Sequence, residues 1–276
     1  MEINLENVTA GYIKDSPIIK DLNLNFTEEG IWGILGPNGS GKTTLLRVLA
    51  GILDYSGSVK ISIRDVSEYE LADLRNKKRK TLARFISMTP QFSHVYFSYS
   101  VYDCILMGRY SHQRNTFAEL IGNVSDKDKE AVEYALDITG LKDISDKQLS
   151  ELSGGQLQRV FLARTIAQST PIILLDEPTN HLDIKYQIEL MDFLKEWSQG
   201  TTEVDGIPHK NTAITVFHDI PIACNTSDNI VLMKEGRLIK TGPTNKVIAK
   251  ELIEDVYGID FDRAKKITHW GQTPLG

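Results

Sequence analysis

The stretch from residue 36 to residue 44 constrains this chain more than any other, because it fits the pattern G-x-x-x-x-G-K-[ST]. A short apolar run of strand character, residues 31–35, precedes it, and a helical segment, residues 45–50, follows it. This strand–loop–helix context turns a pattern match into the prediction of a phosphate-binding loop. The loop consists of Gly36, Pro37, Asn38, Gly39, Ser40, Gly41, Lys42, Thr43 and Thr44.

Phosphate binding explains the residue types in this loop. Glycines let the backbone turn tightly and approach phosphate oxygens with no Cβ in the way. Backbone N–H groups at the positive end of the following helix then surround the anion. We expect Lys42 to reach the β- and γ-phosphates and the Thr43 hydroxyl to bind Mg²⁺. The alternative, a glycine-rich turn that carries a lysine by chance, is disfavoured because further motifs follow at compatible positions.

Length and composition are those of a globular protein. The 276 residues are enough for one domain, or for one domain with a subdomain. A net charge of −6 argues against a general nucleic-acid binder. With no signal-like N-terminus and no run approaching about 18 apolar residues, we expect a cytosolic chain. Cys104 and Cys224 lie in apolar surroundings without C-x-x-C spacing, so we expect buried small hydrophobes rather than a disulfide or metal pair.

The first part of the chain shows strand patterns around one polar segment. Residues 2–30 and 57–63 alternate apolar and polar side chains, which predicts half-buried antiparallel strands. Tyr12 falls on a turn between strands and could stack on a nucleotide base or pack on the surface. Residues 66–83 are predicted to be helical and contain a basic run, residues 75–80. A solvated helix face is favoured over a nucleic-acid contact for this run, because no aromatic residues interleave with it.

The middle of the chain changes from strand to helix. Residues 85–90 read as a strand, which places Gln91 at its carboxyl end, where open α/β sheets present ligand groups. Residues 92–150 are predominantly helical in pattern, with Ser125 as a predicted N-cap for a helix over residues 126–139. We interpret this block as a helical subdomain inserted into an α/β core.

Two further motifs follow it. Residues 152–156, Leu-Ser-Gly-Gly-Gln, precede a helix predicted to reach about Gln168 with Ser153 as N-cap. Two glycines directly after a cap are poor helix formers, which makes sense if another group must approach that helix end closely. Residues 172–178 form an apolar run typical of a strand buried on both faces. Asp176 and Glu177 come where it ends, and they are suited to a Mg²⁺ shell and to polarising a water.

The last third of the chain continues the alternation of strands and helices. A helix is predicted over residues 184–198, then a polar loop over 198–211, and then a strand over 213–217 that ends at His218. A hairpin is expected around Glu235 and Gly236. A short helix over residues 245–257 and a polar tail, residues 259–276, complete the chain.

Taken together, these motifs resemble the ATP-binding cassette (ABC) ATPases over about residues 1–258. The Leu152–Gln156 segment resembles this family and few others, and its spacing to Asp176–Glu177 and to His218 fits. The resemblance implies an α/β fold: a P-loop NTPase core with a mixed sheet flanked by helices. It also implies an N-terminal antiparallel β subdomain, a helical subdomain at about residues 92–168 and a separate tail at 259–276.

The resemblance also implies roles for individual residues. Tyr12 is expected to stack on adenine, Glu177 to act as general base and His218 to contact the γ-phosphate, with Gln91 touching the attacking water. Mg²⁺ is expected to be held by Thr43, Gln91 and Asp176. In this family the segment Ser153, Gly154, Gly155 and Gln156 closes on the ATP of an opposite subunit, and Asp183 lies at the dimer contact. ATP and Mg²⁺ are thus the implied cofactors, and a second, identical cassette is the implied partner.

One segment narrows the class of cassette. Residues 101–110 are similar to the corresponding stretch of ATPases that serve iron-siderophore, haem and cobalamin importers. In such importers this stretch lines the groove that receives a helix of the permease, so Arg109 and Tyr110 are expected to contact it. The implied partners are transmembrane permease subunits and, indirectly, a substrate-binding protein, with no nucleic acid. The implied location is the cytoplasmic face of the membrane, and other subunits choose the solute.

Two other functions are compatible with parts of the sequence. A soluble cassette ATPase that acts on nucleic acid or ribosomes would use the basic run at residues 75–80, but the acidic net charge opposes it. A regulatory module that holds ATP without turnover would be expected to lack Glu177 or His218, and both are present.

Overall fold

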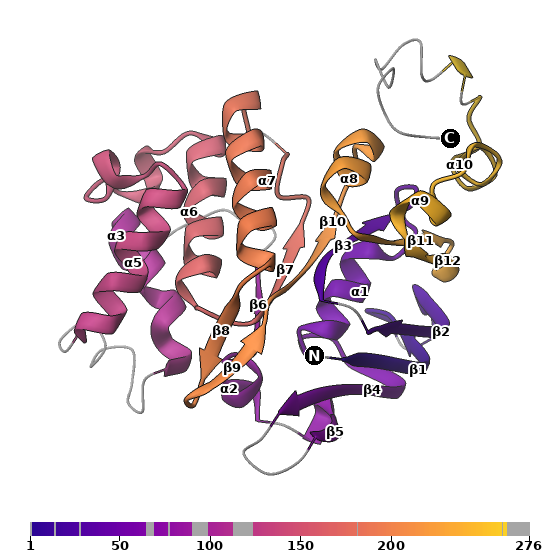
Figure 1. Cartoon of the computed structure of the whole chain (residues 1–276), viewed down its shortest axis with the longest axis horizontal. Coiled ribbons are helices and arrows are strands. Elements are labelled where there is room, and N and C mark those ends of the chain that lie inside the picture. Colours follow the sequence, from indigo (N-terminus) through magenta and orange to yellow (C-terminus); the bar gives the residue numbers. More distant parts are fainter. Residues whose placement is uncertain are drawn as a thin grey trace. The chain divides into compact units, whose positions relative to one another are not determined.

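The computed structural model describes residues 2–13, 15–27, 29–64, 69–76, 78–89, 99–112, 124–180, 182–260 and 262–263. The chain forms two compact units, one of residues 1–77 and 212–276 and the other of residues 78–211. Both units combine strands with helices (Figure 1), so the predicted α/β class is confirmed.

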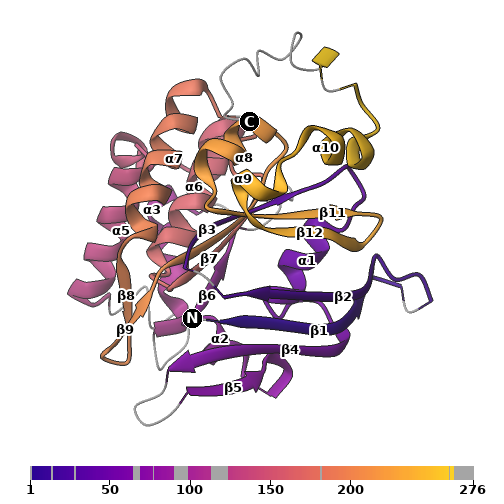
Figure 2. The ribbon, with the colours of Figure 1, turned by 45° about the vertical axis from the view of Figure 1, so that its right-hand side comes forward.

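An antiparallel sheet makes up one part of the first unit (Figure 2). Its strand order is β2-β1-β4-β5, and apolar side chains that alternate along β1 and β2 are buried. The strands predicted in residues 2–30 and 57–63 are therefore confirmed. The bounds are β1 Ile3–Ala10, β2 Ile19–Phe26, β4 Tyr55–Arg64 and β5 Tyr69–Asp73.

The predicted helix over residues 66–83 is wrong for most of its length. The structure has β5, a 3₁₀ turn at Leu74–Asn76 and a short α2 at Arg79–Leu82. Strand β5 pairs antiparallel with β4, from Lys60 opposite Asp73 to Arg64 opposite Tyr69. The neighbouring strand supplies the pairing partners, and this tertiary context overrides the polar helical pattern.

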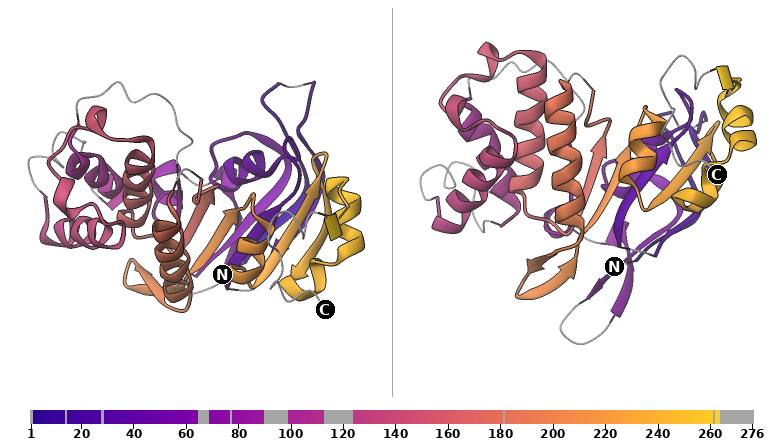
Figure 3. Two further views of the ribbon diagram at one scale, coloured as in Figure 1. Left: turned by 90° about the horizontal axis from the view of Figure 1, so that it is seen from above. Right: turned by 45° about the horizontal axis from the view of Figure 1, so that its top comes forward.

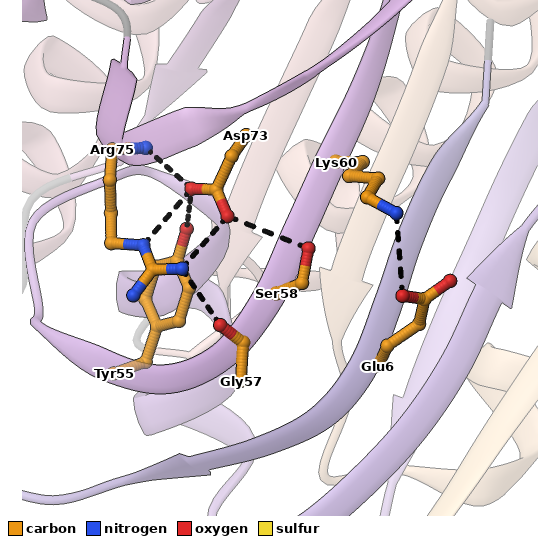
Figure 4. A network of polar contacts seen from close by, with 7 residues as sticks. All are labelled: Glu6, Tyr55, Gly57, Ser58, Lys60, Asp73 and Arg75. Atoms are coloured by element: carbon orange, nitrogen blue, oxygen red, sulfur yellow. Dashed lines mark hydrogen bonds and ion pairs between the residues drawn. The ribbon is translucent and has the colours of Figure 1, made fainter.

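Arg75, the first residue of the basic run, is part of a polar network on this sheet (Figure 4). Its Nε and Nη2 donate to both oxygens of Asp73, at 3.1 and 2.9 Å, and Nη2 also donates to the Gly57 carbonyl at 2.8 Å. The Tyr55 hydroxyl donates to Asp73 at 3.0 Å, and burial raises the Tyr55 pKa. The Arg75 guanidinium lowers the pKa of Asp73 to about 2. Arg75 therefore stabilises the sheet edge rather than presenting a free cation.

The first unit also holds a set of four mixed strands in the order β12-β11-β3-β10. Strand β3 (Gly30–Leu35) runs parallel to both β10 (Thr212–Val216) and β11 (Asn229–Lys234). The residues of β10 are all buried, as expected for an interior parallel strand. Strand β11 turns antiparallel into β12 (Arg237–Pro243) through Glu235 and Gly236, both at positive φ, so the predicted hairpin is confirmed.

Helices flank these strands within the same unit (Figure 3). Helix α1 (Lys42–Leu49) contacts β10, and α8 (Ile220–Thr226) contacts β3. Helix α9 (Thr244–Val247) packs on β11 and β12, and α10 (Lys250–Tyr257) follows it. The single short helix predicted over residues 245–257 is thus two helices.

The second unit is predominantly helical beside two parallel strands (Figure 1). Helix α6 packs against α3 and α5, and Ser125 and Ser153 are the N-caps predicted from the sequence. Short 3₁₀ segments at Met107–His112, Lys142–Ile144 and Leu149–Glu151 link the helices. The bounds are β6 Ile86–Met88, α3 Val101–Leu106, α5 Asp126–Ile138, α6 Gly154–Ala167, β7 Ile172–Asp176 and α7 Ile184–Ser198.

The predicted polar loop at residues 198–211 is instead a β-hairpin. Strands β8 (Thr201–Val204) and β9 (Ile207–Lys210) join through Asp205 and Gly206, both at positive φ. Arg84 donates to both carboxylate oxygens of Asp205, at 2.7 and 2.6 Å, which fixes the hairpin tip. The Asp-Gly pair between β-forming residues is a two-residue turn signal that the sequence carried.

Candidate nucleotide-binding site

The loop from Gly36 to Gly41 has the backbone that the phosphate-binding pattern requires. Strand β3 ends at Leu35 and α1 begins at Lys42, so the loop lies at the positive end of a helix. Gly36, Gly39 and Gly41 all have positive φ, of 154°, 80° and 100°. A Cβ on Gly36 would collide with the Met233 carbonyl, whereas one on Gly39 would meet open space. Gly36 therefore packs closely against β11, and the loop is open at Gly39, as phosphate binding needs.

Lys42 lies folded back over this loop. Its Nζ donates to the carbonyls of Gly36 at 2.7 Å and Pro37 at 3.0 Å, and the residue is 6% exposed. The buried Ser40 Oγ has no hydrogen-bond partner among the described residues. A buried ammonium and an unsatisfied hydroxyl in a loop at a helix N-terminus fit an anionic ligand such as a triphosphate.

Tyr12 and Arg47 contact each other near α1. Arg47 Nη1 donates to the Tyr12 hydroxyl at 2.7 Å, and the guanidinium carbon lies 5.3 Å from the ring centroid. The Tyr12 ring is 52% exposed. An exposed ring fixed at its hydroxyl suits stacking on a base, and Arg47 is a residue that the sequence analysis did not single out.

The strand register brings His218 level with the start of the loop. Val216 of β10 lies opposite Ile34 of β3, and the Phe217 N–H donates to the Ile34 carbonyl at 3.1 Å. His218 is the next residue and is exposed. Because β3 and β10 are parallel, His218 lies at the edge of the first unit from which the loop emerges.

In the second unit, Ser153 and Gln156 form a reciprocal cap on α6. The Gln156 N–H donates to Ser153 Oγ at 3.3 Å, and the Ser153 N–H donates to Gln156 Oε1 at 2.9 Å. Ser153 and Gly154 are exposed, and a Cβ on Gly154 would meet open space. This helix end is therefore accessible to an anion carried by another molecule.

Asp176 and Glu177 follow β7, as the sequence predicted. Asp176 is the last residue of the strand, and its N–H donates to Thr89 Oγ1 at 3.1 Å. Glu177 has a φ of 51°, which is unusual for a residue with a long side chain. Asn180 Nδ2 donates to Glu177 Oε2 at 2.5 Å, and Gln158 Nε2 donates to the Pro178 carbonyl at 3.2 Å. Strained backbone held by side chains on both sides is typical of a functional turn.

Of the two remaining predicted site residues, Asp183 is described by the structure and Gln91 is not. Asp183 is the N-cap of α7, accepting a hydrogen bond from the Tyr186 N–H at 3.1 Å. Gln91 lies outside the described residues. The assignment of Asp183 to a dimer contact and of Gln91 to Mg²⁺ and water stays a prediction.

The structure corrects the predicted role of Arg109. The side chain is buried, with Nε donating to Asp128 Oδ1 at 2.8 Å and Nη1 to the Ala167 carbonyl at 2.8 Å. It therefore joins helices inside the second unit and is not available as a permease contact. Tyr110 remains 45% exposed, with the Lys80 ammonium 5.2 Å from its ring centroid.

The described residues show neither a disulfide between the two cysteines nor a cluster of metal ligands. Cys104 and Cys224 are free thiols; burial raises the pKa of both, that of Cys224 to about 11. Among the described residues there is no cluster of three or more His, Cys, Asp or Glu side chains that could hold a metal ion. In the same residues, no helix has the length and apolar character to cross a membrane.

Comparison with known proteins decides the family. A profile of the family described as "ABC transporter" matches residues 19–180. The Bacillus subtilis (strain 168) protein named "Probable siderophore transport system ATP-binding protein YusV" is 34% identical over 259 residues, which are 94% of this chain and 86% of that protein. This chain belongs to the ABC transporter family. As an ATP-binding member of that family, it is an ATPase.

Two solved ABC structures share this fold. One, described as "An inward-facing conformation of a putative metal-chelate type ABC transporter", has a TM-score of 0.71 and 28% identity over 93% of this chain and 89% of that chain. The other, a dimeric bacterial ABC transporter cassette, has a TM-score of 0.70 and 26% identity over 88% of this chain and 98% of that chain. The predicted P-loop NTPase fold with antiparallel and helical parts is confirmed.

Proposed function

We propose that this ABC ATPase drives an importer that takes up a metal chelate such as an iron-siderophore, haem or cobalamin. ATP turnover is supported by the Gly36–Gly41 loop. The N-terminus of α1 follows this loop, and Lys42 Nζ donates to the Gly36 carbonyl. The substrate class is supported by a relative named for siderophore transport and by a similar solved structure of metal-chelate type.

The proposed roles are those that the resemblance to ABC ATPases implies for each residue. The loop residues Gly36 to Thr44 bind the ATP phosphates, Tyr12 stacks on adenine and His218 contacts the γ-phosphate. Glu177, anchored by Asn180, orients and deprotonates the attacking water. Mg²⁺, bound by Thr43, Gln91 and Asp176, would neutralise charge on the β- and γ-phosphates. Positioning and charge stabilisation then supply most of the rate enhancement.

We propose further that two copies of the chain form the working ATPase. The capped and open N-terminus of α6, with Ser153, Gly154, Gly155 and Gln156, suits the ATP held by an opposite subunit. Asp183 would lie at the contact between the two copies. A similar solved cassette is dimeric, which supports this assembly. ATP would bring the copies together and hydrolysis would release them.

The remaining assignments concern organisation and location. Residues 1–258 are proposed to be the ATPase domain, with a helical subdomain at about 92–168 and a tail at 259–276. The partners are transmembrane permease subunits and, through them, a substrate-binding protein. The chain would then be peripheral at the cytoplasmic face of the membrane.

ATP turnover by the purified chain tests the catalytic assignment. Lys42→Ala should abolish ATP binding, because it removes the ammonium that faces the phosphates. Glu177→Gln should still bind ATP but lose about 10²-fold or more in kcat, since it keeps the shape and removes the base. Phosphate release and equilibrium nucleotide binding are the two measurements. Glu196→Gln, an exposed acid on α7, is the control, and wild-type turnover by Glu177→Gln would contradict the assignment.

A further inference from the structure

A side chain near the far end of the chain contacts the first residue of the phosphate-binding loop. The Gly36 N–H donates a hydrogen bond of 2.9 Å to the hydroxyl oxygen of Tyr257, 221 residues further along the chain. Tyr257 is the last residue of α10, and both residues belong to the same compact unit. No motif in the sequence marks Tyr257.

Gly36 is also held on its other sides. Its φ of 154° and the close approach of the Met233 carbonyl leave no room for another residue type. Its own carbonyl accepts the 2.7 Å hydrogen bond from Lys42 Nζ. The Tyr257 hydroxyl therefore acts on the residue that fixes the resting position of the Lys42 ammonium.

Helix α10 is itself anchored to β11. Lys234, the last residue of β11, donates from Nζ to the Asp255 carbonyl at 2.7 Å. Ile253 and Val256 are buried, and the Gly258 N–H caps the helix by donating to the Glu254 carbonyl at 2.8 Å. Tyr257 therefore contacts the loop from a helix that is held in place by its own packing and hydrogen bonds.

We propose that Tyr257 is a positioning residue for ATP binding, which holds Gly36, and through it Lys42, where the phosphates are received. This proposal rests on the proposed binding of ATP by the Gly36–Thr44 loop. The hydroxyl acts through the backbone and does not itself touch the nucleotide. A buried N–H group that loses its acceptor is costly, so without the hydroxyl the loop is expected to shift toward other partners.

The Tyr257 hydroxyl keeps its proton across the neutral pH range. Burial raises the pKa of Tyr257 to about 12, so the group stays neutral and accepts the Gly36 hydrogen bond throughout the neutral range. The effect of removing it should accordingly be the same from about pH 6 to pH 9.

Tyr257→Phe is the sharpest test, because it keeps the ring and removes only the hydroxyl. We expect the ATP dissociation constant of the full-length chain to rise by about 3- to 10-fold, as for loss of one hydrogen bond. The kcat at saturating ATP should stay within about twofold, since the general base is untouched. Tyr134→Phe, which alters a ring 52% exposed on α5, is the matched control and should leave both constants unchanged.

The Gly36 amide gives a direct spectroscopic readout. The chain contains two Leu-Gly pairs, Leu35–Gly36 and Leu275–Gly276, so labelling leucine with ¹³C at the carbonyl and glycine with ¹⁵N selects two amide signals. In Tyr257→Phe the Gly36 amide proton should move upfield, while the other signal stays in place. A role in packing alone would lower the melting temperature but leave ATP affinity of the folded protein unchanged.

The outcomes separate this inference from the proposed function. An unchanged ATP dissociation constant in folded Tyr257→Phe overturns the positioning role, whether or not the amide signal moves. If Tyr257→Phe does not fold, Lys234→Met, which removes the hydrogen bond between β11 and α10, should raise the constant in the same direction, and no rise overturns the proposal. ATP binding by Lys42→Ala equal to wild type would instead contradict the phosphate-binding loop itself.

Discussion

At the scale of single residues, the Asp73 carboxylate makes the stability of a sheet edge depend on pH. Arg75 and Tyr55 both donate to it, and the guanidinium is the largest cause of its lowered pKa of about 2 (Figure 4). A carboxyl group whose pKa is lower in the folded state adds stability above its ordinary pKa of about 4. That stability is lost as the pH falls through about 2.

We therefore predict that Asp73→Asn makes the free energy of unfolding depend less on pH under acid conditions. The free energy of unfolding of the wild type should fall more steeply than that of the variant between pH 4 and pH 2. Urea unfolding at a series of pH values measures this difference. Asp192→Asn, at an exposed position on α7, is the control; parallel curves for wild type and Asp73→Asn would contradict the prediction.

The residues that could be predicted from the sequence are those whose chemistry depends on near neighbours in the chain. The Gly36–Thr44 loop and the Ser153 cap need only the adjacent strand, turn or helix. Arg47 and Tyr257 act on residues 35 and 221 positions away, and nothing in their own surroundings signals it. The permease contact predicted for Arg109 rests on a resemblance over residues 101–110, which does not reveal the pairing of Arg109 with Asp128.

At the scale of elements, the Arg109–Asp128 pair joins three helical segments of the second unit. Arg109 belongs to the 3₁₀ segment after α3, and Asp128 belongs to α5. Ala167, whose carbonyl accepts a hydrogen bond from Arg109, is the last residue of α6. The two side chains are 8% and 3% exposed, and Ser125 Oγ donates to the second Asp128 oxygen at 2.6 Å. A buried, hydrogen-bonded pair of this kind is sensitive to the loss of one partner.

Arg109→Met should lower the free energy of unfolding by about 3–5 kcal/mol, because it removes the charge that compensates buried Asp128. Arg109→Met combined with Asp128→Leu should recover much of that loss. Urea unfolding of the two variants measures the coupling. Lys129→Met, which breaks an exposed pair with Asp126, should cost less than about 1 kcal/mol; an equally small loss in Arg109→Met would refute the structural role.

Three strands that the sequence analysis does not predict, β5, β8 and β9, form by pairing with a neighbouring strand. Strand β5 exists because β4 offers it a partner, and β8 and β9 pair with each other around the Asp205–Gly206 turn. Helices α6 and α7 agree closely with their predicted ranges, because the Ser153 cap and the apolar periodicity are local signals. Short strands carry much less of this local information.

At the scale of the whole molecule, two cations of the basic run, Arg75 and Lys80, contact groups of the protein, which argues against their use in binding a nucleic acid. Arg75 is engaged with Asp73 and Gly57, and the Lys80 ammonium lies over the Tyr110 ring. Cations that are occupied by protein groups are poorly placed to neutralise phosphates of a nucleic acid. The proposed importer role therefore places the functional contact at Tyr110 rather than at this run.

Tyr110→Ala should weaken association with the permease while ATP binding survives. An exposed aromatic ring at the centre of an interface typically contributes about 2 kcal/mol, so recovery of permease should fall by about tenfold or more. The chain carrying Glu177→Gln would be tagged, expressed in its own cell and recovered with ATP from detergent-solubilised membranes, with mass spectrometry of the bound proteins. Tyr134→Ala, at a ring of similar exposure on α5, is the control. Undiminished permease recovery would remove Tyr110 from the interface, and ribosomal or nucleic-acid partners in the soluble fraction would overturn the importer function itself.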